Sequence, residues 1–297
     1  MYDIIVVGAG PAGLTAALYA LRANKTVLVF ESETYGGQIV KAASVENYPG
    51  ITKISGFDYA TNLYNQVKNH GGKIKFETVI KIEKDKTVIT NKDTYQAKAV
   101  IIATGASHRK LNLEQESEFT GKGISYCATC DGNFFKNKVV AVLGGGNAAL
   151  EDALYLSNIA KKVYLIHRRD TFRGEGKYLK DLKAKENVEF ILKSNVVKIY
   201  GNNKLESVDV EDNEGNIQNI KINGLFIAVG QVPNNEMFSN VVTLNESGYI
   251  VAEDEVHTNT KGIYVAGDNR VKYLRQLTTA VSDGSVAATI AIKEMEE

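Results

Sequence analysis

The sequence has little cysteine, no excess of charge of either sign and no long apolar run. Only two of its 297 residues are cysteine, too few for a disulfide framework, so we expect a reducing compartment and a cytoplasmic protein. Lysine plus arginine and aspartate plus glutamate each total 35, and this balance argues against binding to nucleic acid. No stretch approaches the roughly 20 apolar residues of a membrane helix. Residues 4–7 open an apolar strand without the basic region of a cleavable leader.

The two cysteines stand close together, in the order Cys127-Ala128-Thr129-Cys130, and Asp131 follows at once. Such a pair can close a small disulfide ring that accepts and donates two electrons, and its context favours thiolate near neutral pH. Asp131 is placed to move the accompanying proton. Structural zinc needs four ligands, but no second cysteine pair exists and the four histidines lack ligand spacing, so no metal is expected. If the two cysteines were instead unpaired structural thiols, the nucleotide-binding motifs on either side of them would have no explanation. The pair therefore predicts a redox centre.

The N-terminus has the pattern of a dinucleotide-binding unit. A strand is expected at 2–7, a helix from residue 14 by its apolar spacing, and a second strand at 26–30 that ends at Glu31. The turn between the first strand and the helix consists of Gly8, Ala9, Gly10, Pro11, Ala12 and Gly13. Its glycines permit a sharp turn, approach of a pyrophosphate and close helix packing. A bare glycine turn is the alternative, but the strand flanks and Glu31 favour FAD or NAD with an unphosphorylated ribose.

The same unit returns after the cysteines, with strands expected at 139–143 and 163–166. Its turn and helix start consist of Gly144, Gly145, Gly146, Asn147, Ala148 and Ala149. The position of Glu31 is taken by His167, and Arg168, Arg169 and Arg173 follow. Guanidinium groups bind a phosphate bidentately, whereas a carboxylate repels it. The second unit therefore predicts NADP(H), with a solvated basic patch as the alternative.

The remaining elements are predicted from apolar spacing and from turn residues. A helix is expected near 59–70 and another near 276–295, and loops at 36–38 and 45–50. Strand candidates lie within 73–90 and at 100–105, 189–197, 205–211, 217–221, 225–230 and 263–266. Gly267 and Asp268 follow the last of these strands, where an acid could hydrogen-bond the ribityl or phosphate portion of a flavin. Polar stretches at 108–119 and 239–248 are the expected domain crossovers.

With these motifs assembled, the chain closely resembles the low-molecular-weight bacterial thioredoxin reductases over essentially its whole length. The motifs that carry the resemblance are GAGPAG (8–13), YGGQ (35–38), ENYPG (46–50), ATGA (103–106), CATCDG (127–132), GGGNAALEDALYL (144–156), HRRDTFR (167–173), AVGQVPN (228–234) and GDNRVKYLRQLTTA (267–280). Asn269 is a departure, because the family more often has an apolar residue there.

The resemblance implies an α/β fold with two Rossmann-like, three-layer nucleotide-binding domains. An FAD domain (1–110 and 242–297) would receive an inserted NADPH domain (111–241) that carries the cysteines. The family mechanism passes electrons from NADPH to FAD, then to the Cys127–Cys130 disulfide, then to thioredoxin. In it Cys130 contacts the flavin, Cys127 attacks thioredoxin and Asp131 is the acid/base. A homodimer and a rotating NADPH domain are also implied.

The resemblance extends to individual cofactor-binding positions in both expected domains. The residues expected to bind FAD are Gly8, Gly10, Pro11, Ala12, Gly13, Glu31, Gly37, Gln38, Asn47, Ala103, Thr104, Gly105, Gly267, Asp268, Arg275, Gln276 and Leu277. The residues expected to bind NADPH are Gly144, Gly146, Asn147, Ala148, Ala149, His167, Arg168, Arg169 and Arg173.

Two other functions remain open at this point. The chain could serve another small redox protein, such as a glutaredoxin-like or peroxiredoxin-linked partner, or it could be a flavoprotein that senses redox state without steady turnover. Phe134 and Phe135 follow the cysteine motif directly. If this segment is extended, the two rings point opposite ways and at least one is exposed for partner docking. The alternative is that both rings are buried packing residues.

Overall fold

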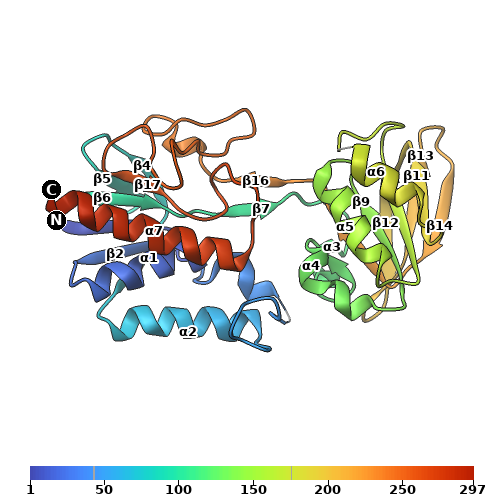
Figure 1. Cartoon of the computed structure of the whole chain (residues 1–297), viewed down its shortest axis with the longest axis horizontal. Helices are drawn as coiled ribbons and strands as arrows, with labels where there is room; N and C mark the ends of the chain where they lie inside the picture. The colour runs from blue at the N-terminus through green and yellow to red at the C-terminus, as the bar shows by residue number, and fades with distance from the viewer. Residues whose placement is uncertain (43, 175) are drawn as a thin grey trace. The chain divides into compact units, whose positions relative to one another are not determined.

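The computed structural model describes residues 1–42, 44–174 and 176–297. The chain divides into two compact units (Figure 1): Met1–Ser107 with Val232–Glu297 form unit 1, and His108–Gln231 form unit 2. Unit 2 is thus an insertion into the sequence of unit 1. The second boundary falls earlier than the expected 241/242, because Phe238, Val241 and Val242 are buried in the core of unit 1. The stretch 239–248 is therefore part of unit 1 and not a crossover.

Unit 1 is built on one mixed sheet in the order β3-β2-β1-β6-β5-β4, with β17 also paired to β6. The parallel strands are β1 (Tyr2–Val7), β2 (Val27–Glu31), β3 (Lys73–Phe76), β6 (Thr94–Ile102) and β17 (Ile263–Val265). β4 (Val79–Ile82) and β5 (Thr87–Thr90) add an antiparallel edge. Parallel strands are buried on both faces, which explains their continuous apolar runs.

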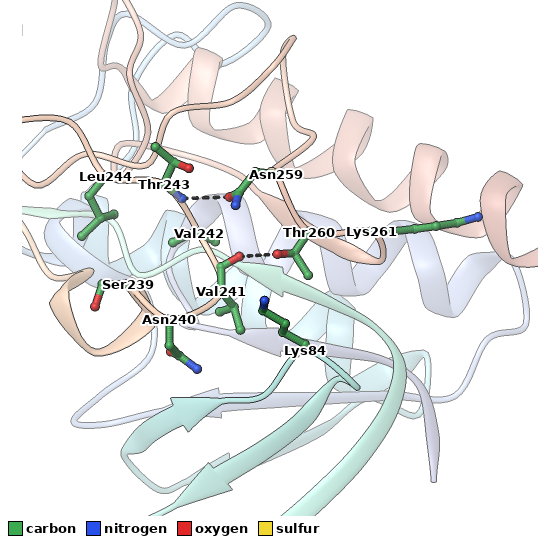
Figure 2. A pocket seen from close by; sticks show the side chains of 10 residues that line it. All are labelled: Lys84, Ser239, Asn240, Val241, Val242, Thr243, Leu244, Asn259, Thr260 and Lys261. Atoms are coloured by element: carbon green, nitrogen blue, oxygen red, sulfur yellow. Dashed lines mark hydrogen bonds between the residues drawn. The ribbon is translucent and has the colours of Figure 1, made fainter.

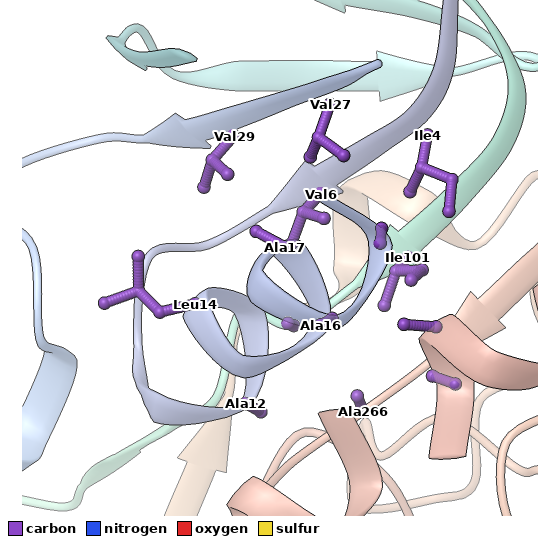
Figure 3. Close-up of a cluster of buried hydrophobic side chains, with 14 of the residues drawn as sticks. Ile4, Val6, Ala12, Leu14, Ala16, Ala17, Val27, Val29, Ile101 and Ala266 are labelled. Atoms are coloured by element: carbon purple, nitrogen blue, oxygen red, sulfur yellow. The ribbon is translucent and has the colours of Figure 1, made fainter. Parts of the chain in front are cut away.

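Alternating side chains of these strands supply two separate cores. Ile4 and Val6 point to the face covered by the helices α1 (Pro11–Arg22), α2 (Gly56–Asn69) and α7 (Leu277–Glu296), as Figure 3 shows for α1. Ile5 and Val7 point to the other face. There they share a core with side chains of β4 and β5 and with Phe238, Val241 and Val242. α1 and α7 approach closely, since a Cβ on Gly284 would lie 2.2 Å from the carbonyl oxygen of Ala12.

Unit 2 has three layers around a parallel sheet in the order β11-β10-β9-β15-β8. The strands are β8 (Ile124–Ser125), β9 (Val139–Leu143), β10 (Lys162–His167), β11 (Val188–Leu192) and β15 (Gly224–Ile227). Helices α5 (Asn147–Ser157) and α6 (Gly176–Lys183) pack on one face. The antiparallel strands β12 (Ser194–Gly201), β13 (Leu205–Asp212) and β14 (Ile217–Lys221) cover the other.

Short elements complete the chain. The two segments that link the units contain β7 (Ala106–His108) and β16 (Gln231–Pro233), which pair with each other. The others are α3 (Glu116–Phe119), α4 (Ala128–Asp131) and the 3-10 helices η1 (Gly37–Lys41), η2 (Gly132–Phe135) and η3 (Glu236–Phe238). η1 replaces part of a predicted loop, and η2 replaces the extended segment considered after the cysteines. No helix of the described residues is both long and apolar enough to cross a bilayer.

Candidate active site

Cys127 and Cys130 are joined by a disulfide, with Cα atoms 5.3 Å apart. One helical turn, α4, begins directly after Cys127, and the N–H of Cys130 donates to Cys127 Sγ at 3.2 Å. A separation of this size is ordinary for a disulfide. The pair can therefore open and close without a large backbone displacement.

Ser125, at the end of β8, connects the disulfide to Asp131. Its Oγ donates to Asp131 Oδ2 at 2.6 Å and accepts the N–H of Cys127 at 3.1 Å. Burial raises the pKa of Asp131, and the hydrogen bond from Ser125 opposes part of that rise. The carboxyl group is thus suited to hold a proton beside the sulfur atoms. The sequence analysis missed Ser125, although a hydroxyl residue at a strand end two positions before the pair was a usable signal.

The aromatic residues after the pair are not equivalent. Phe134 is 43 % exposed, whereas Phe135 is partly buried and meets the Phe226 ring edge-on, with centroids 5.2 Å apart. The segment is the 3-10 helix η2 and not an extended strand, so the expected alternation of side chains does not apply to it. Of the two rings, Phe134 is the more exposed one.

The glycine turn of unit 1 meets the geometric needs of a pyrophosphate site. Gly8 has φ +108°, and a Cβ there would lie 2.3 Å from the carbonyl oxygen of Ala103. At Gly10, no atom of the described chain lies within 4 Å of the place a Cβ would take. The N–H of Ala9 donates to Glu31 Oε2 at 2.9 Å, which holds the turn against the end of β2. The N-terminus of α1 is therefore open to an approaching anion.

Segments distant in sequence lie against this turn within unit 1. A Cβ on Gly37 would be 3.3 Å from Gly10 Cα, and one on Gly267 would be 2.9 Å from Ala12 Cβ. Asn47 Nδ2 donates to Gln276 Oε1 at 3.1 Å. These contacts bring the YGGQ and GD motifs to the turn and join Asn47 of the ENYPG motif to Gln276. The sequence could associate these motifs only through the resemblance.

Asp268 supplies a test of whether the site suits a flavin. Its Oδ1 is buried and, among the described residues, has no hydrogen-bond partner. Burial raises the pKa of Asp268 to about 6. A buried acceptor without a donor is costly, and the hydroxyl groups of a ribityl chain would satisfy it. The residues present therefore fit FAD.

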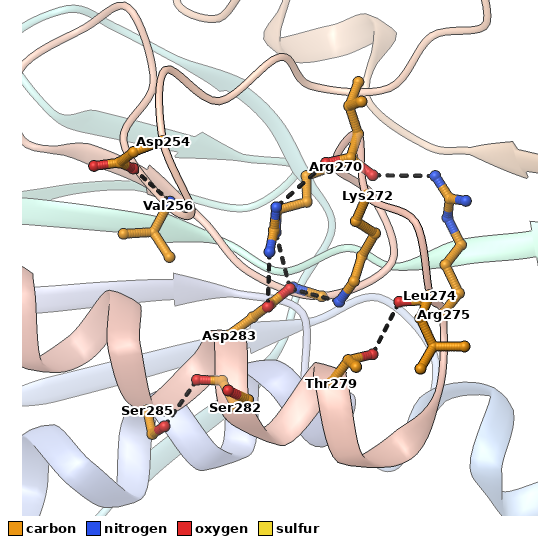
Figure 4. A network of polar contacts seen from close by, with 12 residues as sticks. Asp254, Val256, Arg270, Lys272, Leu274, Arg275, Thr279, Ser282, Asp283 and Ser285 are labelled. Atoms are coloured by element: carbon orange, nitrogen blue, oxygen red, sulfur yellow. Dashed lines mark hydrogen bonds and ion pairs between the residues drawn. The ribbon is translucent and has the colours of Figure 1, made fainter.

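Two basic side chains near Asp268 form ion pairs with a second acid, Asp283. Arg270 Nη2 lies 2.9 Å from Asp283 Oδ1, and Lys272 Nζ lies 2.8 Å from Asp283 Oδ2, as Figure 4 shows. Asp283 Oδ2 also accepts the N–H of Gly267 at 2.9 Å. Arg275 instead donates to the carbonyl oxygen of Asp268 at 3.2 Å. The loop before α7 is thus fixed by ion pairs, and the sequence analysis did not single out Asp283.

The other residues expected to bind FAD have simpler environments in unit 1. Thr104 Oγ1 donates to Asn235 Oδ1 at 3.1 Å and accepts from Asn269 Nδ2 at 3.1 Å, so Asn269 has a polar role here. Gln38 lies in η1 and accepts from Lys41 at 3.4 Å. The remaining four are Pro11, the first residue of α1; Gly13, in its first turn; Gly105, with φ +66°; and Leu277, the first residue of α7.

The glycine turn of unit 2 repeats that of unit 1. Gly144 has φ +156°, and no described atom lies within 4 Å of a Cβ position on Gly146. Asn147, Ala148 and Ala149 form the first turn of α5. The second turn can therefore receive a pyrophosphate in the same way as the first.

The basic residues from His167, the last residue of β10, to Arg173 divide into one buried and three exposed side chains. His167 is buried beneath Gly145, its Nε2 lies 3.1 Å from the carbonyl oxygen of Thr171, and burial lowers its pKa. Arg168, Arg169 and Arg173 are exposed, and none has an ion pair within the described part of the chain. Three exposed guanidinium groups after β10 are suited to bind a phosphate.

A cavity of about 650 Å³ in unit 1 lies elsewhere (Figure 2). It is lined by Lys84 and by residues of the segments 239–244 and 259–261. None of the predicted site residues contributes to it, and we do not assign it to the redox site.

Comparison with known proteins agrees with this arrangement. The pyridine nucleotide-disulphide oxidoreductase family matches residues 2–284. The thioredoxin reductase of Listeria innocua is 44% identical over 303 residues, which cover 100% of this chain and 95% of the relative. That of Bacillus subtilis is 40% identical, with 100% and 96% covered. The crystal structure of thioredoxin reductase from Streptococcus pyogenes superposes with a TM-score of 0.94 at 40% identity, covering 100% and 98%.

The chain belongs to the thioredoxin reductase family. It is an oxidoreductase with a mixed α/β fold, and the resemblance seen in its sequence is confirmed. The described residues contain no group of three or more histidine, cysteine or acidic side chains arranged to hold a metal ion.

Proposed function

We propose that this chain reduces the disulfide of thioredoxin with electrons from NADPH, by way of FAD and the Cys127–Cys130 pair. The observation that carries the proposal is the disulfide beside the buried Asp131, in a chain that matches thioredoxin reductases over its full length. The relatives give no support to a glutaredoxin-like or peroxiredoxin-linked partner, or to a sensor without turnover.

Unit 1 is the FAD-binding domain in this proposal. Gly8, Gly10 and Gly13 admit the pyrophosphate, Glu31 accepts from the adenosine ribose, and Asp268 accepts from the ribityl hydroxyls. Bound FAD supplies a two-electron carrier between the nicotinamide and the disulfide. The chain's own contribution is to orient that group. The further binding residues are Pro11, Ala12, Gly37, Gln38, Asn47, Ala103, Thr104, Gly105, Gly267, Arg275, Gln276 and Leu277.

Unit 2 is the NADPH-binding domain. Arg168, Arg169 and Arg173 bind the 2′-phosphate. Their exposure, and the absence of ion pairs to other described residues, leave them available for it. The turn residues Gly144 and Gly146 with Asn147, Ala148 and Ala149 bind the pyrophosphate. His167 supports the turn from beneath Gly145 and completes the set expected for this coenzyme.

The dithiol chemistry follows from the two sulfur atoms and Asp131. Opening the disulfide breaks the S–S bond and takes up two electrons and two protons. The thiolate of Cys127 then attacks a thioredoxin sulfur, one thioredoxin thiolate leaves, and a mixed disulfide forms. The thiolate of Cys130 displaces the second thioredoxin thiolate and restores the Cys127–Cys130 bond. Asp131 donates and accepts the protons that these sulfur atoms exchange, and Cys130 is the sulfur that faces the flavin.

Three further features belong to the proposal. The protein forms a homodimer. It acts in the cytoplasm, and the scarcity of cysteine supports this location. Unit 2 rotates relative to unit 1 during turnover, because nicotinamide and disulfide need the same flavin. Phe134 anchors thioredoxin beside the redox pair, and its exposed ring supports that role.

The test is oxidation of NADPH by the yellow, FAD-loaded protein with oxidised thioredoxin. Side-by-side assays with glutaredoxin and a peroxiredoxin-linked disulfide protein compare the partner classes. We expect turnover with thioredoxin that Cys127→Ser and Cys130→Ser each abolish while FAD and the dimer are retained. Absence of thioredoxin turnover, or substantial turnover in either variant, would refute the proposed function.

A further inference from the structure

Thr104 and Asn235 form a hydrogen bond at the unit 1 end of the two linking segments. Thr104 lies shortly before β7, and Asn235 lies shortly after β16. These two strands pair with each other. Thr104 Oγ1 donates to Asn235 Oδ1 at 3.1 Å. The bond therefore closes the paired linkers where they join unit 1, and we call Thr104 and Asn235 the linker root.

Asn235 uses its whole side-chain amide in this position. The residue is fully buried, and its Nδ2 donates to the carbonyl oxygen of Gly248 at 2.9 Å and to that of Asn269 at 2.8 Å. Its Oδ1 accepts from Thr104. Rotation of the amide would break all of these bonds, so the side chain has a single orientation.

Asn269 joins the linker root to the loop that carries Asp268. It follows Asp268 directly and is fully buried. Its Nδ2 donates to Thr104 Oγ1 at 3.1 Å and to the carbonyl oxygen of Ile102 at 3.2 Å. Its own carbonyl oxygen accepts from Asn235. The residue next to the expected flavin contact is thereby bound to both members of the linker root.

The N–H groups of Asn269 also fix its orientation. Its Oδ1 is buried and has no hydrogen-bond partner among the described residues. A rotated amide would place this oxygen against the carbonyl oxygen of Ile102, where two acceptors repel each other. An unsatisfied buried acceptor is costly. An apolar side chain would avoid that cost but would lose the bonds to Thr104 and Ile102.

We propose that Asn269 is a positioning residue that couples the retention of FAD to the order of the linker root. This rests on the proposed function, in which Asp268 binds the ribityl hydroxyls. A flavin that orders Asp268 also orders the adjoining Asn269, and Asn269 holds Thr104 and Asn235. Coupling of this kind is reciprocal, so a change that loosens the linker root also weakens the hold on FAD.

The flavin loop has a second anchor, which limits the expected effect. Asp283 of α7 accepts the N–H of Gly267 at 2.9 Å. Loss of the Asn269 bonds should therefore loosen the loop without releasing it. We expect variants at Asn269 to be isolated with FAD bound.

The experiment uses the FAD-loaded full chain and needs neither NADPH nor thioredoxin. The rise in flavin fluorescence after dilution gives the rate of FAD release. Deuterium exchange with mass spectrometry reports on peptides that cover 103–108 and 231–236, with a β1 peptide as the internal reference. Wild type is compared with Asn269→Val and Asn240→Val. The second is a matched control, because Asn240 Nδ2 donates to the carbonyl oxygen of Ile82, the last residue of β4, at 2.8 Å.

Asn269→Val should release FAD roughly 2- to 12-fold faster than wild type, the range for loss of one net hydrogen bond. The two linker peptides should exchange faster by a similar factor, whereas the β1 peptide should not change. Asn240→Val should alter neither FAD release nor linker exchange.

Asn269→Asp provides a readout that a purely structural role would not change. A protonated carboxyl group has nearly the shape of an amide and can donate through its O–H, whereas a carboxylate cannot donate. The rate of FAD release relative to wild type at the same pH should therefore be near 1 at pH 5, below that of Asn269→Val. It should rise by pH 8, where the carboxyl group ionises and a buried charge adds to the loss.

Unchanged FAD release or unchanged linker exchange in Asn269→Val would overturn the assignment. So would equal effects of Asn240→Val, faster exchange of the β1 peptide, or a pH-independent ratio for Asn269→Asp. If Asn269→Val is isolated without FAD, the pH profile of Asn269→Asp decides alone. A wild-type protein that retains FAD but does not reduce thioredoxin removes the proposed function, whereas failed release and exchange tests remove only the role of Asn269.

Discussion

Ser125 Oγ donates a 2.6 Å hydrogen bond to Asp131 Oδ2. The same oxygen accepts the N–H of Cys127 at 3.1 Å, so one hydroxyl group orients both the acid and the first cysteine. A hydrogen bond to the ionised form of a carboxyl group favours that form. Ser125 therefore limits the rise in pKa that burial imposes on Asp131.

Replacing Ser125 by alanine should raise the pKa of Asp131 further. The limb of the pH–rate profile that reports this acid then moves to higher pH, whereas Ser125→Thr, which keeps the hydroxyl, should leave it in place. The measurement is single-turnover reduction of thioredoxin by pre-reduced enzyme between pH 5 and 9. A profile that is identical in wild type and Ser125→Ala would show that the hydrogen bond has no influence on the reaction.

Arg168 and Arg169 should determine the choice of coenzyme. Charge-assisted hydrogen bonds contribute about 1.5–3 kcal/mol each, which corresponds to about 10- to 150-fold per contact. Replacing both residues by alanine should raise KM for NADPH by at least that factor and leave KM for NADH nearly unchanged. Steady-state kinetics with both coenzymes checks this. Arg109→Ala is a control for loss of positive charge outside this motif, and an unaltered NADPH/NADH preference in the double variant would contradict the assignment.

Phe134→Ala and Phe135→Ala should have different effects. The first removes an exposed anchor, and we expect KM for thioredoxin to rise at least about fivefold while a small aromatic disulfide reacts as before. The second removes a ring packed against Phe226 and should lower the free energy of unfolding, by up to about 3 kcal/mol. Parallel assays with both acceptors measure the first effect, and urea unfolding measures the second. Equal loss with both acceptors in Phe134→Ala would exclude a docking role.

His257 should stabilise unit 1 more at pH 6 than at pH 9. Its Nε2 lies 2.6 Å from Glu294 Oε1 and its Nδ1 2.6 Å from Asp254 Oδ2, and these carboxylates raise its pKa. Since the folded pKa exceeds the unfolded value, the stabilisation is complete below about pH 6.5 and fades as pH rises through the folded pKa.

Urea unfolding of the FAD-loaded protein at the two pH values checks this. His257→Gln should lose about 0.5–1 kcal/mol at pH 6, the scale of a partly exposed ion pair, and less at pH 9. His70→Gln is the matched control, because His70 has no ion pair among the described residues. A loss that is equal at both pH values would mean that His257 acts by packing and not by charge.

The sequence by itself determined the parts of this protein that depend on local spacing. The two glycine turns, the apolar strands before them and the spacing of Cys127 and Cys130 each constrain a short stretch of backbone, so their geometry follows from neighbouring residues. The strands β1, β9 and β14 accordingly begin and end where the pattern predicted. The site residues could be named for the same reason, because their motifs are contiguous.

Only the tertiary structure decided which side chains meet across distant elements. Ser125 reaches Asp131 because β8 delivers it to the start of α4. Phe135 differs from Phe134 because the chain coils into η2 and Phe226 lies on one side of it. Burial produces the raised pKa values of Asp131 and Asp268. Such effects depend on what excludes water from a carboxyl group, and packing between elements far apart in the chain settles that.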